Sequence, residues 1–129
     1  MIAGAEPNQQ LLYQMELEDE GYRVLTACNG REAMEMIAQA CPDLVVLDPH
    51  TRGQKGDTVF QRIKHIAPEL PVLVYTGYLA SPKDAFSWPA EAHLTKTSNL
   101  DPLKRMVARM LDRRSGQAHL SQAWAHQAV

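Results

Sequence analysis

The sequence has little cysteine and no long apolar run, and each shortage excludes a class of protein. Among 129 residues the only cysteines are Cys28 and Cys41, too few and too far apart for a zinc site or a disulfide framework. Apolar runs such as Leu44–Leu47 are short, whereas a membrane-spanning helix needs about 20 apolar residues. The first ten residues have neither a basic start nor an apolar stretch, so they do not read as a secretion signal.

An excess of charge of one sign is also missing. The 13 Lys and Arg residues and 15 Asp and Glu residues leave a formal net charge of −2. Domains that bind nucleic acid usually carry a basic excess, so we expect no nucleic-acid partner for this domain. No glycine-rich phosphate cradle follows any apolar segment, which disfavours a nucleotide-binding enzyme. The content of 45% hydrophobic and 22% charged residues is typical of one globular domain.

The apolar residues that are present alternate between strand spacing and helical spacing. Strands are predicted at residues 1–3, 22–26, 44–47, 72–75 and 93–95. Four groups of apolar residues have helical spacing: Leu11, Leu12 and Met15; Ala33, Met34, Ile37 and Ala38; Val59, Phe60, Ile63 and Ile66; and Leu103, Met106, Val107, Met110 and Leu111. Asn8 is the expected N-cap of the first of these helices. Two prolines make any helix at residues 81–89 short or irregular. This alternation predicts an α/β fold, a doubly wound five-stranded parallel sheet with helices on both faces.

Polar residues follow three of the predicted strands. Asp48 follows the third strand, Thr76 the fourth and Lys96 the fifth, and the carboxyl ends of such strands are where ligands bind. A carboxylate beside an amine and a hydroxyl suits phosphoryl transfer to the carboxylate itself, because the amine balances charge and the hydroxyl donates a hydrogen bond. On spacing alone, a buried Asp–Lys pair that only joins two loops explains these residues equally well.

Several short motifs, taken in order, resemble the receiver domain of response regulators. They are Glu6-Pro7-Asn8, Gly21-Tyr22-Arg23-Val24, Asn29-Gly30-Arg31-Glu32-Ala33, Asp43–Asp48 with Gly53 and Gly56, Pro71–Tyr75 with Thr76-Gly77, and Leu94-Thr95-Lys96. Each motif is weak alone, but all of them in this order indicate the family strongly. The resemblance implies a flavodoxin-like receiver fold over residues 1–113. Residues 114–129 are then a C-terminal tail that either extends the last helix or frays.

The resemblance implies a switch in two-component phosphorelay signalling rather than an enzyme acting on substrates. A histidine kinase or a phosphotransfer protein would phosphorylate Asp48 with Mg²⁺ bound. Thr76 would then shift inward, Lys96 would pair with the phosphoryl group, and His93 would stand where the family's switch aromatic usually lies. The implied partners are this phosphodonor and a downstream protein or output domain. The implied location is the cytoplasm, away from membranes, and the sequence leaves a homodimer open.

The sequence departs from the family at the metal site. The family places two acidic residues directly after the first strand to hold Mg²⁺, and this sequence has Gly4 and Ala5 there. Asp48, Glu6 and the backbone carbonyl of His50 remain as candidate ligands, so we expect a lowered magnesium affinity. We also expect a shortened first strand. The missing acidic pair, with a remodelled helix before the fifth strand, supports a second hypothesis. The chain would be a degenerate receiver that acts as a phosphorylation-independent protein-interaction module.

Three of the candidate residues also have simpler interpretations. Glu6 can be an acidic residue at a helix N-terminus, where the helix dipole favours negative charge. His50 can be a solvated loop histidine. His93 either gives the switch a pH dependence near neutrality or is an ordinary half-exposed strand histidine.

Overall fold

The computed structural model describes residues 1–4, 7–49, 56–77 and 88–118 of the chain. Within this part a five-stranded parallel sheet has the order β2-β1-β3-β4-β5, which confirms the predicted doubly wound fold. The elements in chain order are β1 (Ile2–Ala3), α1 (Pro7–Asp19), β2 (Thr26–Ala27), α2 (Gly30–Ala40), β3 (Val45–Leu47), α3 (Gly56–Ile66), β4 (Val72–Thr76), β5 (Ala92–Thr95) and α4 (Asp101–Ala118). The helix predicted to be remodelled before β5 falls largely outside the described residues, as does the end of the tail.

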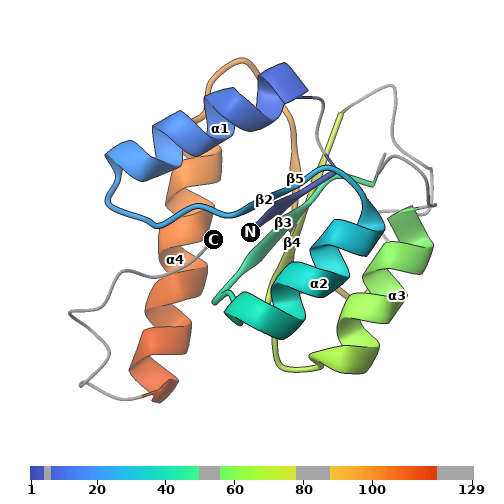
Figure 1. The fold of residues 1–129 in the computed structure, drawn as a ribbon. Helices are drawn as coiled ribbons and strands as arrows, with labels where there is room; N and C mark the ends of the chain where they lie inside the picture. The colour runs from blue at the N-terminus through green and yellow to red at the C-terminus, as the bar shows by residue number, and fades with distance from the viewer. Residues whose placement is uncertain (5–6, 50–55, 78–87, 119–129) are drawn as a thin grey trace.

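The sheet lies between two helical layers (Figure 1). Helices α1 and α4 cover one face, and α2 and α3 cover the other. Alternate side chains of the strands therefore enter two separate cores. One core contains Tyr13, Leu17, Leu73, Tyr75, Leu103 and Val107 with their neighbours, and the other contains Ala33, Ile37, Val45, Val59, Ile63 and Val74 with theirs. The short strands β1 and β3 are buried on both faces, as expected for the centre of a parallel sheet.

The first helix is present, but the prediction of its apolar face was wrong. Leu11, Leu12 and Met15 are 56%, 48% and 58% exposed, and the buried residues of α1 are Gln10, Tyr13 and Leu17. Both sets fit helical spacing, so periodicity alone does not choose between them. Gln10 is buried without an energetic penalty because its side-chain amide donates to the carbonyl of Ala27 at 2.7 Å.

Other details also differ from the prediction. Helix α1 begins at Pro7, so Asn8 lies in its first turn instead of capping it. The second strand is residues 26–27 instead of 22–26, because β1 has only two residues to pair with it. Ile66, predicted on the buried face of α3, is 49% exposed at the last position of that helix.

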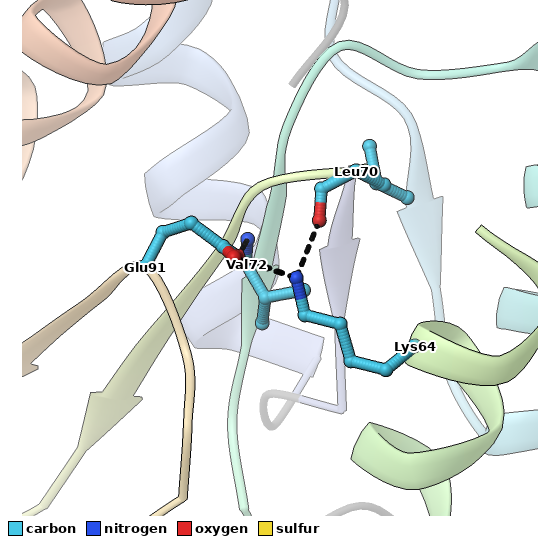
Figure 2. Close-up of polar contacts among 4 residues, drawn as sticks. All are labelled: Lys64, Leu70, Val72 and Glu91. Carbon is cyan, nitrogen blue, oxygen red and sulfur yellow. Dashed lines mark hydrogen bonds and ion pairs between the residues drawn. The ribbon is translucent and has the colours of Figure 1, made fainter. Parts of the chain in front are cut away.

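A polar cluster holds α3, β4 and the start of β5 together at the amino edge of the sheet (Figure 2). The Lys64 ammonium of α3 donates to the Leu70 carbonyl at 2.9 Å and to the Glu91 carboxylate at 2.6 and 2.7 Å. The same carboxylate accepts a hydrogen bond from the Val72 backbone N–H at 2.7 Å. Glu91 thus fixes the beginning of β4 and the beginning of β5, and the opposite ends of these strands carry Thr76 and Lys96.

Candidate functional site

Asp48 lies directly after β3, the central strand, at the carboxyl edge of the sheet. Its backbone N–H donates to the Ala3 carbonyl of β1 at 3.0 Å, so the residue continues the pairing of two central strands. The residue is only 8% exposed. A carboxylate this well buried needs a charged or hydrogen-bonding partner.

Lys96 supplies that partner from the end of β5. Its ammonium lies 2.5 Å from Oδ2 of Asp48 and donates to Oε1 of Gln9 on α1 at 3.2 Å. The same nitrogen is 5.9 Å from the centre of the Tyr75 ring, within the range of a cation–π contact. Three elements therefore surround one cationic side chain at the mouth of the site.

Thr76 ends β4 beside Lys96. Its carbonyl accepts a hydrogen bond from the Lys96 backbone N–H at 2.6 Å. Its side chain is fully buried, and its hydroxyl has no hydrogen-bond partner among the residues that the structure describes. Leaving a buried hydroxyl unpaired costs roughly 1–3 kcal/mol.

The other predicted site residues have different positions. His93 is half-buried on β5 and pairs in register with Val74. Strand alternation places it on the face opposite Leu94, which packs with the α1 and α4 core. Glu6 and His50, the further metal candidates, lie outside the described residues.

The described residues do not by themselves form a magnesium site. Mg²⁺ takes near-octahedral oxygen ligands, usually from carboxylates, waters and phosphate. Asp48 offers one carboxylate, which already contacts the Lys96 ammonium, and no group of three His, Cys, Asp or Glu side chains in the described ranges could hold a metal ion. The described residues thus provide one carboxylate ligand for Mg²⁺, that of Asp48, and the Lys96 ammonium competes with the metal for this carboxylate.

Gly4 is in the left-handed backbone region, with φ of 91°. Its N–H donates to the Ala27 carbonyl at 3.1 Å, and Gln10 donates to this same oxygen from α1. This shared acceptor fixes the backbone between β1 and α1. A residue with a Cβ is strained in this conformation by roughly 1–2 kcal/mol, so the backbone here favours glycine over an acidic residue.

Sequence reasoning found Asp48, Thr76 and Lys96, which the structure brings to one edge, and missed Gln9 and Tyr75. Tyr75 carries a signal in hindsight, because it is the residue before Thr76 in an apolar strand. Burial raises the pKa of its phenol above the ordinary value of 10.0, and a hydrogen bond with the Thr97 backbone partly opposes that shift. Gln9 follows the Glu-Pro-Asn motif within one helical turn, but only its contact with Lys96 shows that it belongs to the site.

Residues 1–108 match the family described as the response regulator receiver domain. The chain is 30% identical over 98 residues to sporulation initiation phosphotransferase F of Bacillus subtilis, covering 74% of this chain and 79% of that protein. It also matches the transcriptional regulatory protein ZraR of Escherichia coli at 32% identity, covering 70% of this chain but 21% of that protein. The match thus covers about four fifths of one relative and about a fifth of the other.

Solved structures give the same assignment. The response regulator TrrA of Thermotoga maritima, crystallised with Mg²⁺ and BeF, superimposes with a TM-score of 0.76 at 33% identity, covering 84% of this chain and 95% of that one. TrrA has also been solved in complex with the histidine kinase ThkA, again with a TM-score of 0.76, at 34% identity and with 85% and 95% of the two chains covered. The chain belongs to the response regulator receiver domain family of two-component phosphorelay signalling. None of the described helices is both long and apolar enough to span a membrane.

Proposed function

We propose that the chain is a phosphorelay receiver that accepts a phosphoryl group on Asp48 and then changes a protein-interaction face. The donor is a phosphohistidine on a histidine kinase or a phosphotransfer protein. An Asp48 carboxylate oxygen attacks phosphorus, the P–N bond breaks, and its electron pair returns to the imidazole, which takes up a proton from solvent. The product is an acyl phosphate on Asp48, read by a downstream protein or output domain. Residues 1–113 form the receiver and residues 114–129 the tail.

The observation that carries this proposal is the trio at the carboxyl edge of the sheet. Asp48 is the nucleophile, and the Lys96 ammonium 2.5 Å away is placed to pair with a phosphoryl oxygen. The buried Thr76 hydroxyl, with no described partner, supplies a hydrogen bond to a second phosphoryl oxygen and moves inward to do so. His93 lies on β5, three positions before Lys96, and takes the place of the family's switch aromatic, which follows the movement of Thr76. The likeness to TrrA, a response regulator crystallised with Mg²⁺ and BeF, supports the same roles.

Magnesium binds weakly at this site in our proposal. Among the described residues, Asp48 is the carboxylate that this site offers, and Glu6 and the His50 carbonyl are the remaining candidate ligands. Gly4 and Ala5 replace the acidic pair of the family, and the left-handed backbone at Gly4 opposes an acid at that position. A single carboxylate that also holds a lysine gives Mg²⁺ less than it usually takes from protein.

The close Lys96–Asp48 pair and the left-handed backbone at Gly4 also favour one alternative function. If the Lys96–Asp48 pair is permanent, the domain acts as a phosphorylation-independent interaction module whose partner surface is always presented. In that case Asp48→Asn leaves partner binding intact. In the phosphorelay, by contrast, phosphorylation changes the affinity for the partner, and Asp48→Asn removes that change.

A beryllofluoride titration followed by backbone NMR tests the main proposal. Beryllofluoride bound to an aspartate mimics its phosphoryl form, so we expect saturable shifts of the Thr76 and Lys96 amide signals. We expect Mg²⁺ to strengthen beryllofluoride binding only when the Mg²⁺ concentration is high. The Asp48→Asn variant should show no shifts. Absence of saturable shifts in the unmodified chain, with TrrA responding as the positive control, would refute the phosphoacceptor role.

A further inference from the structure

Gln9 is a neutral side chain that accepts a hydrogen bond from the Lys96 ammonium. It is in the first turn of α1, and its Oε1 accepts a hydrogen bond from Lys96 Nζ at 3.2 Å. The neighbouring buried Gln10 ties this turn to β2 through the 2.7 Å bond with the Ala27 carbonyl. One turn further on, the Tyr13 ring packs edge-on against Tyr75 of β4, with centroids 5.5 Å apart. The acceptor that holds Lys96 is therefore mounted on a well-anchored helix.

The Lys96 ammonium lies at the end of a long and flexible side chain. A lysine ammonium is a compact point charge with three donors and loses much rotamer freedom when fixed. In the unphosphorylated chain, Asp48 and Gln9 occupy two of these donors. Phosphorylation of Asp48 converts the carboxylate into an acyl phosphate and places the negative charge on the phosphoryl oxygens, so the first of these two partners changes. Gln9 is neutral in both states and does not change.

We propose, on the basis of the phosphoacceptor role given above, that Gln9 is a positioning residue that keeps the Lys96 ammonium at the mouth of the site before and after phosphorylation. Gln9 acts through Lys96 and takes no part in the bond changes at phosphorus. Among the described residues, Lys96 is the cation at this site and no metal-binding group of three side chains is present. The binding of an anionic group therefore depends strongly on how Gln9 orients Lys96. The orientation of this one side chain then determines how firmly the anionic group is held.

Gln9→Met tests the inference, since methionine keeps the length and shape of the side chain and removes the acceptor. Gln14→Met is the matched control, because Gln14 is a half-buried residue of the same helix and has no part in the site. We expect Gln9→Met to weaken beryllofluoride binding about five- to tenfold, the size of one partly solvated hydrogen bond to a charged group. Gln14→Met should bind as the unmodified chain does.

A second readout separates positioning from a merely structural role. In the beryllofluoride-free protein, the ammonium protons of Lys96 should give an NMR signal that is slowed in its exchange with water. Asp48 still accepts from Lys96 in Gln9→Met, so the signal should remain but exchange faster with water, whereas Gln9→Glu, which keeps an acceptor, should exchange as slowly as the unmodified chain. An exchange rate in Gln9→Met equal to that of the unmodified chain overturns the proposal.

The two proposals fail in different ways. Equal beryllofluoride affinity of Gln9→Met and the unmodified chain refutes the role of Gln9 and leaves the phosphoacceptor role of Asp48 standing. An unmodified chain that binds no beryllofluoride refutes the role of Asp48, and the role of Gln9 fails with it. Loss of affinity in Gln9→Met together with an equal loss in Gln14→Met would show a general effect on α1 and would also overturn the inference.

Discussion

Replacing Glu91 with alanine should destabilise the domain by about 2 kcal/mol, mainly through one backbone group. Val72 is fully buried, and its N–H donates to Oε1 of Glu91 at 2.7 Å. Removing the acceptor leaves a buried donor without this partner, which costs roughly 1–3 kcal/mol. The ion pair with Lys64 adds little, because the Glu91 side chain is 42% exposed and exposed pairs contribute about 0–1 kcal/mol.

Urea unfolding of Glu91→Ala, Glu91→Gln and Glu35→Ala tests this reasoning. Glutamine keeps an acceptor for the Val72 N–H and loses the charge, so it should cost about 0.5 kcal/mol. Glu35 forms an exposed pair with Arg31 at 3.4 Å one helical turn away, and its removal should cost about 0.3–0.5 kcal/mol. We expect Glu91→Ala to lower the free energy of unfolding much more than Glu91→Gln does. Glu35→Ala should lower it by about as much as Glu91→Gln. Equal losses for alanine and glutamine at position 91 would refute the role of the buried N–H.

Two further predictions concern Thr76 and two tyrosines whose pKa values are raised by burial. Thr76→Val should raise the free energy of unfolding of the unphosphorylated chain by roughly 1 kcal/mol, because it removes a buried hydroxyl with no described partner, and should weaken beryllofluoride binding; a less stable variant would contradict the reasoning. Burial raises the pKa of Tyr22 and Tyr75 above 10.0 in the folded chain, so the unfolded chain loses these protons first. Stability should therefore be unaffected by these groups below pH 10 and should fall as the pH rises through their raised pKa values, as followed by tyrosinate absorbance and urea unfolding. A stability that is constant or rising over that range would contradict the assignment.

The features that sequence could predict are those set by local pattern and by the topology of a parallel sheet. Asp48, Thr76 and Lys96 each follow an apolar strand, and parallel strands bring their carboxyl ends to one edge. Their convergence therefore required no knowledge of side-chain packing. The same holds for α2, where Ala33 and Ile37 of the predicted apolar face are buried.

The features that could not be predicted depend on contacts between distant segments. The burial of Gln10 is favourable only because the Ala27 carbonyl of β2 lies within hydrogen-bonding distance. Leu11, Leu12 and Met15 fit the helical period as well as the residues that are buried, so pattern alone favoured the wrong face. Gln9 enters the site through Lys96, 87 positions further along the chain. No spacing within the first helix indicates that contact.

The most direct test of the account is the mass of the intact chain after incubation with acetyl phosphate at high Mg²⁺ concentration. We predict the gain of one phosphoryl group on the unmodified chain, its loss after hydroxylamine treatment as expected for an acyl phosphate, and no gain on Asp48→Asn. TrrA, treated in parallel, controls for the reagent. An unmodified chain that gains no mass while TrrA does, or a gain that persists in Asp48→Asn, would contradict the assignment of Asp48 as the phosphoacceptor.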